Sequence, residues 1–137
     1  MRLRIKTAIG LGTAVVLGAG LSIAASAAQP VEGRTIASLA SGEWTLRFRN
    51  GGAPRKLCVK TGRELVKLRH QGARCRTFVV SDEGGTATVN YSCEGHGSGS
   101  TTIKRETREI VQIESQGIED GAPFHFSAEA RLTGTCR

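Results

Sequence analysis

Residues 124–132 read Phe-His-Phe-Ser-Ala-Glu-Ala-Arg-Leu, which is the clearest β-strand pattern in the chain. Apolar and polar side chains alternate without a break. The apolar positions are Phe124, Phe126, Ala128, Ala130 and Leu132. Because successive side chains of a β-strand point to opposite faces, the pattern predicts a strand with one face in a core and the other, including His125, at the surface.

The same alternation recurs along the chain. It runs from Trp44 to Phe48, where Asn50-Gly51-Gly52 signals a hairpin turn into a second strand through residues 57–59. Further strands are predicted near residues 78–80, 86–93, 101–103 and 111–113. The prediction is a mainly β fold: an antiparallel meander forming a curved sheet or partial barrel, with one short α-helix and two disulfides.

Two shorter segments need separate interpretation. Residues 61–64, Thr-Gly-Arg-Glu, match a capping box, and Gly72 can end a helix, so one short helix is predicted after residue 61. Residues 95–99, Gly-His-Gly-Ser-Gly, resemble a phosphate loop superficially. The strand formers at 101–103 follow instead of a helix, which favours a flat or bulged strand.

The N-terminal residues are typical of an export signal. A basic start with Arg2, Arg4 and Lys6 precedes an uncharged apolar stretch, and Ala25-Ser26-Ala27 supplies the small residues that a signal peptidase requires. The alternative, an uncleaved membrane anchor, is less favoured because the apolar stretch is short and rich in glycine.

The chain therefore divides into three predicted parts. Residues 1–27 form a signal peptide, residues 28–42 an N-terminal arm without a clear period, and residues 43–137 a single disulfide-bonded β domain. A protein with this organisation is expected in the periplasm or outside the cell.

Four cysteines follow the predicted cleavage site: Cys58, Cys75, Cys93 and Cys136. An even number in a small exported chain predicts two disulfides, whereas zinc needs closely spaced pairs, so no metal is expected. Three pairings are open. We predict Cys58–Cys75 and Cys93–Cys136, because Cys93 and Cys136 both continue inward-facing positions of their strands by even steps.

Positive charge is concentrated in one part of the chain. Residues 45–76 hold ten basic residues against the single acidic Glu64: Arg47, Arg49, Arg55, Lys56, Lys60, Arg63, Lys67, Arg69, Arg74 and Arg76. This half is a candidate contact for an anionic envelope component or an acidic envelope protein. The alternative is that these residues form an ordinary solvent-exposed surface whose positive charge is balanced by neighbouring acidic strands. Nucleic acid is not expected, since few aromatic residues are present to stack on bases.

Catalytic signals are weak. His70, His96 and His125 lack metal-ligand spacing, and there is no Gly-x-Ser-x-Gly nucleophile motif. We therefore predict a protein that is not an enzyme and has no cofactor.

Several short motifs share a pattern: Gly42-Glu43-Trp44, Leu57-Cys58-Val59, Cys75, Tyr91-Ser92-Cys93-Glu94-Gly95 and Gly134-Thr135-Cys136. Together they resemble the DUF3617 family, small exported proteins of proteobacteria without an assigned function. The resemblance covers residue 36 to the C-terminus. It implies an exported protein and carries over no catalytic residues.

These observations predict an exported, non-enzymatic binding or envelope-associated protein. The alternative is a periplasmic inhibitor of an envelope-degrading enzyme such as a lysozyme, and a hydrolase without a recognisable motif ranks third. The six aromatic residues all fall in strand patterns: Trp44, Phe48, Phe78, Tyr91, Phe124 and Phe126. We expect them to fill a packed core, in preference to lining an open groove.

Overall fold

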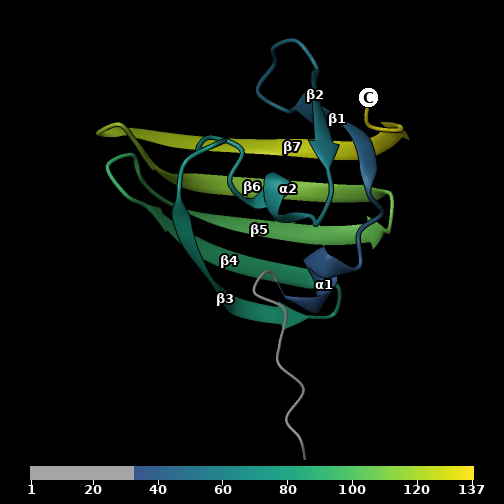
Figure 1. Ribbon diagram of the computed structural model, residues 1–137, viewed down its shortest axis with the longest axis horizontal. Helices are drawn as coiled ribbons and strands as arrows, with labels where there is room; N and C mark the ends of the chain where they lie inside the picture. The colour runs from purple at the N-terminus through teal and green to yellow at the C-terminus, as the bar shows by residue number, and fades with distance from the viewer. Residues whose placement is uncertain (1–32) are drawn as a thin grey trace, which may run out of the picture.

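The computed structural model describes residues 33–137, in which seven strands form one antiparallel sheet (Figure 1). The strands are β1 (Gly42–Phe48), β2 (Arg55–Val59), β3 (Cys75–Glu83), β4 (Thr86–Cys93), β5 (Gly97–Thr107), β6 (Ile110–Glu119) and β7 (Ala122–Gly134). Their order is β2-β1-β7-β6-β5-β4-β3, so within residues 33–137 β2 and β3 are the edges of a sheet that is not closed. The predicted curved antiparallel meander is confirmed.

The predicted signal peptide lies outside the described residues. The glycine-rich residues 95–99 form the turn after β4 and the start of β5, which confirms the strand interpretation. His125 is exposed on β7, as predicted.

Two one-turn helices lie over the same face of the sheet, which we call the inner face. Helix α1 (Arg34–Ala37) contacts β3, β4 and β5, whereas α2 (Arg63–Val66) contacts β2 and β5. Figure 1 shows both helices in front of the sheet. The opposite face, which we call the outer face, carries the mostly polar side chains that alternate with the inward-facing ones along each strand. No helix within residues 33–137 lies on it.

Helix α2 is shorter than predicted. The Thr61 N–H donates to Glu64 Oε2 at 3.3 Å, which is half of the predicted capping box, and Gly62 takes the N-cap position with φ 87°. The helix ends at Val66 and does not reach Gly72. The reason is tertiary: the Val66 carbonyl accepts a 2.6 Å hydrogen bond from Thr101 Oγ1, and Lys67 leaves the helical region.

The N-terminal arm contains α1, which the sequence pattern did not predict. Thr35 and Ile36 are buried against the sheet. The Asp82 carboxylate on β3 holds the helix start by accepting hydrogen bonds from the Arg34 N–H at 2.5 Å and from the Thr35 N–H and hydroxyl. A helix of one turn held by a distant carboxylate has no local sequence signal.

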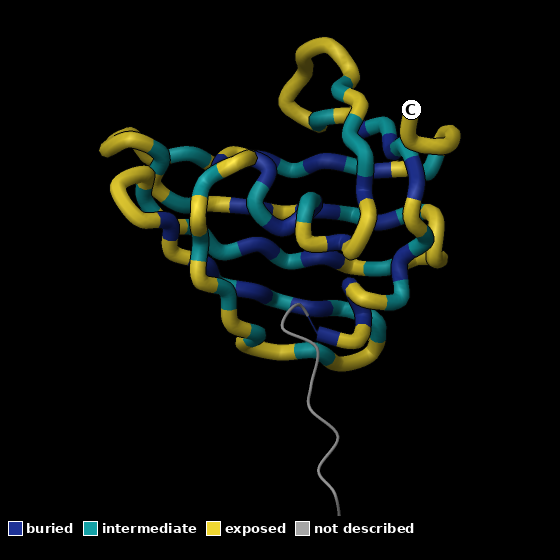
Figure 2. Tube along the Cα trace, in the orientation of Figure 1, coloured by how far each residue is buried: buried dark blue, intermediate teal, exposed yellow. Residues whose placement is uncertain are grey.

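The core lies between the inner face and the two helices, and burial alternates along the central strands (Figure 2). Trp44 and Tyr91 are buried and Phe126 is 7% exposed, whereas Phe48 and Phe124 are partly buried. The Phe126 ring meets Phe48 edge-on at 5.5 Å and stacks on Phe124 at 6.2 Å between centroids. A packed core is therefore confirmed for five of the six aromatic residues.

The predicted cysteine pairing is wrong, although both disulfides exist. The bridges are Cys75–Cys93 and Cys58–Cys136. Cys75 and Cys93 lie directly opposite each other in the β3–β4 ladder. Strands β4 and β7 are three steps apart in the sheet, about 14 Å, which is too far for a bridge between Cys93 and the residue after β7.

The expected burial of Phe78 is also wrong, for a related reason. The bridge to Cys93 places Cys75 on the inner face, so Thr77 and Val79 follow it there. Phe78 takes the alternate position and is 59% exposed on the outer face.

The contact between α1 and Asp82 makes a pH-dependent prediction. Burial raises the pKa of the Asp82 carboxyl, but hydrogen bonds from Thr35 and from the Arg34 N–H outweigh this effect and lower it overall. A carboxyl with a lowered pKa contributes stability above its unfolded pKa of about 4 and loses it as pH falls through the folded pKa.

We therefore expect Asp82→Asn to be less stable than the wild type at neutral pH, with a difference that shrinks as the solution is acidified below about pH 4. Urea unfolding of both proteins at several pH values measures this difference. Glu114→Gln, an exposed outer-face change of equal charge, serves as the control. A difference that stayed constant with pH would contradict the assignment.

Candidate functional site

One cleft lies between α2 and the edge of the sheet formed by β3 and β4. Its volume is about 350 Å³, and it is lined by Arg63, Val66, Lys67, Cys75, Arg76, Thr77 and Val89. Helix α2 and the residue after it provide one wall, and the two strands provide the other. The 2.6 Å hydrogen bond from Thr101 to Val66 fixes the helix end, while the Cys75–Cys93 bridge fixes the start of β3.

The lining carries positive charge only. Arg63, Lys67 and Arg76 are basic, and none of the lining residues is acidic. Lys67 Nζ donates one hydrogen bond, to the Ala73 carbonyl at 2.9 Å, which holds the loop after α2. An ammonium group has three N–H donors, so Lys67 retains donors for an anionic ligand.

The floor of the cleft is apolar. Val66 and Val89 are buried core residues, and the disulfide side chain of Cys75 lies beside them. A cleft of this kind offers an apolar surface to a hydrocarbon group and cations to a phosphate or carboxylate. The arrangement is suited to an amphiphile with an anionic head.

Two further residues of the predicted basic set, Arg74 and Lys60, lie close to the segments that form this cleft. Arg74 lines a neighbouring hollow together with Arg76, Ser92 and Glu94. Lys60 is exposed just before α2. The start of β3 and the α2 segment thus bring together Arg63, Lys67, Arg74 and Arg76.

The other basic residues lie elsewhere and most have partners. Lys56 pairs with Glu43 at 2.7 Å, and Arg69 pairs with Glu119 at 2.5 Å. Arg55 donates to the Leu68 carbonyl at 3.3 Å. Arg47 is exposed on β1. The ten residues therefore do not form one continuous surface.

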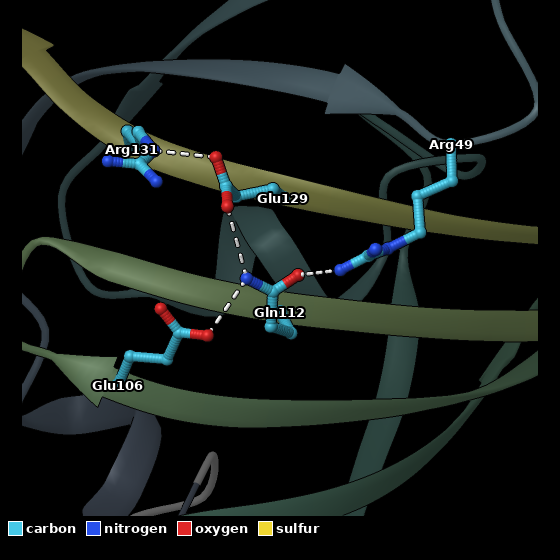
Figure 3. A network of polar contacts seen from close by, with 5 residues as sticks. All are labelled: Arg49, Glu106, Gln112, Glu129 and Arg131. Carbon is cyan, nitrogen blue, oxygen red and sulfur yellow. Dashed lines mark hydrogen bonds and ion pairs between the residues drawn. The ribbon is translucent and has the colours of Figure 1, made fainter.

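Arg49 belongs to a polar network on the outer face (Figure 3). It donates to the Gln112 side chain, which donates in turn to Glu106 at 3.0 Å and to Glu129 at 3.2 Å. Hydrogen bonds from Arg131 and Gln112 lower the pKa of the Glu129 carboxyl to about 2. Because its members satisfy one another across β5, β6 and β7, this network is a structural feature of the outer face.

A buried polar pair lies on the inner face, which the sequence did not reveal. His70 Nδ1 lies 3.3 Å from the Tyr91 hydroxyl, and His70 Nε2 lies 3.0 Å from the His96 carbonyl oxygen. Burial raises the pKa of Tyr91. Both side chains are buried, and the rings meet edge-on at 5.3 Å, so the pair anchors the loop after α2 to the sheet.

Within residues 33–137, no group of three His, Cys, Asp or Glu side chains is placed to hold a metal ion. No helix in this range has the length and apolar character needed to cross a membrane.

Comparison of the chain with protein-family models, with curated proteins and with solved structures finds no match. Membership of the DUF3617 family therefore stays a prediction based on short motifs. The two disulfides are typical of a protein that folds outside the cytoplasm.

Proposed function

We propose that the protein is an exported, non-enzymatic binding domain that recognises an anionic amphiphile of the cell envelope. One observation carries the proposal: three basic residues, Arg63, Lys67 and Arg76, are among those that line a cleft with an apolar floor, and no acidic residue lines it. The disulfides and the predicted signal peptide support a location in the periplasm or outside the cell.

The ligand class follows from the size and chemistry of the cleft. Its volume of about 350 Å³ is at the lower end for ligand pockets, so it suits a head group and part of one acyl chain. A phosphate or carboxylate in the cleft would lie beside the wall that carries Arg63 and Lys67. A phosphorylated envelope lipid combines both features.

Vesicle co-sedimentation of the mature chain tests the proposal. We expect binding to vesicles of phosphatidylcholine mixed with phosphatidylglycerol, and none to pure phosphatidylcholine. Lys67→Glu should weaken binding about tenfold or more, since each basic residue near an anionic surface contributes about 1 kcal/mol. Arg47→Glu changes net charge equally on a strand that does not line the cleft, so it is the matched control.

Two further measurements distinguish recognition of the head group, recognition of the acyl chain and general attraction of charge. Competition by free glycerol phosphate would show that the head group alone is recognised, whereas its failure to compete would show that the acyl chain is needed. Equal loss of binding in Lys67→Glu and Arg47→Glu would overturn the cleft as the site and leave only general attraction of charge.

The inhibitor alternative predicts a different result. A column of the immobilised protein should then retain one envelope-degrading enzyme from an envelope extract, and high salt should not release it. A lipid-binding protein should instead lose its charge-driven partners as salt screens the attraction.

A further inference from the structure

Strand β3 is a long free edge with an unusual surface. It has nine residues and pairs only with β4, so one side of its backbone has no strand partner within residues 33–137. Of the three large apolar side chains that the described part leaves exposed, two are on this strand: Phe78 at 59% and Val80 at 56%. The other edge, β2, has only five residues and follows Pro54, which blunts it.

The hydrogen-bonding groups of the free edge can be assigned. The Glu94 N–H donates to the Arg74 carbonyl at 3.2 Å, so position 74 belongs to a hydrogen-bonded pair with β4. Hydrogen-bonded and non-bonded positions alternate in an antiparallel ladder. Cys75, Thr77 and Val79 therefore direct their backbone N–H and C=O groups away from β4, toward the free edge.

Strand β3 carries positive charge near its start and negative charge at its end. Arg74 immediately precedes the strand and Arg76 is its second residue, whereas Asp82, which holds α1, and Glu83 are its last two residues. Charged residues on an edge, and the bulge near Val80, ordinarily discourage pairing with other strands. A second copy running antiparallel is an exception, because its acidic end meets the basic end of the first.

We propose that β3 pairs with β3 of a second copy about a two-fold axis near Val79, forming a symmetric dimer with a continuous sheet. Antiparallel pairing uses the free N–H and C=O groups of both edges. Phe78 and Val80 of one copy lie beside Val80 and Phe78 of the other, which covers the exposed apolar side chains. Arg76 of each copy lies near Glu83 of its partner, and the interface is isologous.

Sedimentation equilibrium of the mature protein over a range of concentrations tests the dimer. We expect a reversible monomer–dimer equilibrium for the wild type. Arg76→Glu and Glu83→Arg should each raise the dimer Kd about tenfold or more, because like charges then face each other across the interface. The double variant Arg76→Glu/Glu83→Arg should restore the Kd to near the wild-type value.

Two results would overturn this inference. One is a wild type that remains monomeric at the highest concentration reached. The other is a double variant whose Kd stays as high as that of the single variants, which would rule out the antiparallel register. Phe78→Ala should also weaken the dimer. Glu83 does not line the cleft, so the effect of Glu83→Arg is independent of the proposed lipid binding.

Discussion

Replacing both Cys58 and Cys136 by serine is expected to lower the free energy of unfolding by roughly 4–5 kcal/mol. The bridge spans a sequence separation of 78 residues, and the loop-closure model assigns about 4.5 kcal/mol to a loop of that length. A typical domain has only about 5–15 kcal/mol of stability in total. Urea unfolding of the mature protein measures the loss as a lower midpoint.

The other bridge provides the matched control. Cys75→Ser/Cys93→Ser removes the same atoms from a loop with a separation of 18 residues, for which the model assigns about 3 kcal/mol. The long-range bridge should therefore have the larger effect. Peptide mapping without reduction should first recover the Cys58–Cys136 and Cys75–Cys93 peptides. A Cys93–Cys136 peptide would contradict the structure directly.

The second large effect is expected at Phe126. Phe126→Ala should cost about 3–5 kcal/mol, because it opens a cavity in the core and removes ring contacts with Phe48 and Phe124. Thermal or urea unfolding measures this cost. A nearly unchanged midpoint would show that the inner face is not packed around this ring.

Phe78→Ala is the control for that experiment, since it makes the same chemical change on an exposed side chain. Its expected effect on unfolding of the monomer is within about 0.5 kcal/mol. The measurement is made at low protein concentration, so that any dimer formed through β3 does not contribute. Equal losses for Phe126→Ala and Phe78→Ala would contradict the inner and outer faces assigned to β7 and β3.

These two variants would also inform the functional proposals. Phe78 has no role in the lipid cleft, so Phe78→Ala should bind anionic vesicles as the wild type does while dimerising more weakly. A variant that lost both properties would show that dimer formation contributes to lipid binding, as expected if two clefts act together on one surface.

Much of the fold followed from local pattern. The alternation at residues 124–132 and 87–93 predicted strands β7 and β4, and Asn50-Gly51-Gly52 predicted the turn between β1 and β2. These predictions held because the period of side-chain direction in a strand is a local property of the backbone. The even number of cysteines in a chain with a signal-like start likewise predicted two disulfides.

The candidate site was only partly visible in the sequence. Arg63, Lys67 and Arg76 were among ten basic residues, and nothing local distinguished them from Lys56 or Arg69, which have acidic partners in the structure. Which of the ten basic residues line the cleft depends on which strands and helices are neighbours in the folded chain.

Periodicity and composition were sufficient to predict the inward faces of β1, β4 and β7, the run of antiparallel strands and the number of disulfides. Three features required the folded structure: the pairing of the cysteines, the outward direction of Phe78, and the contact by which Asp82 holds α1. These outcomes depend on strand order and register, which bring Cys75 opposite Cys93 and Cys58 near Cys136. Such contacts join residues far apart in the chain, and local pattern carries no information about them.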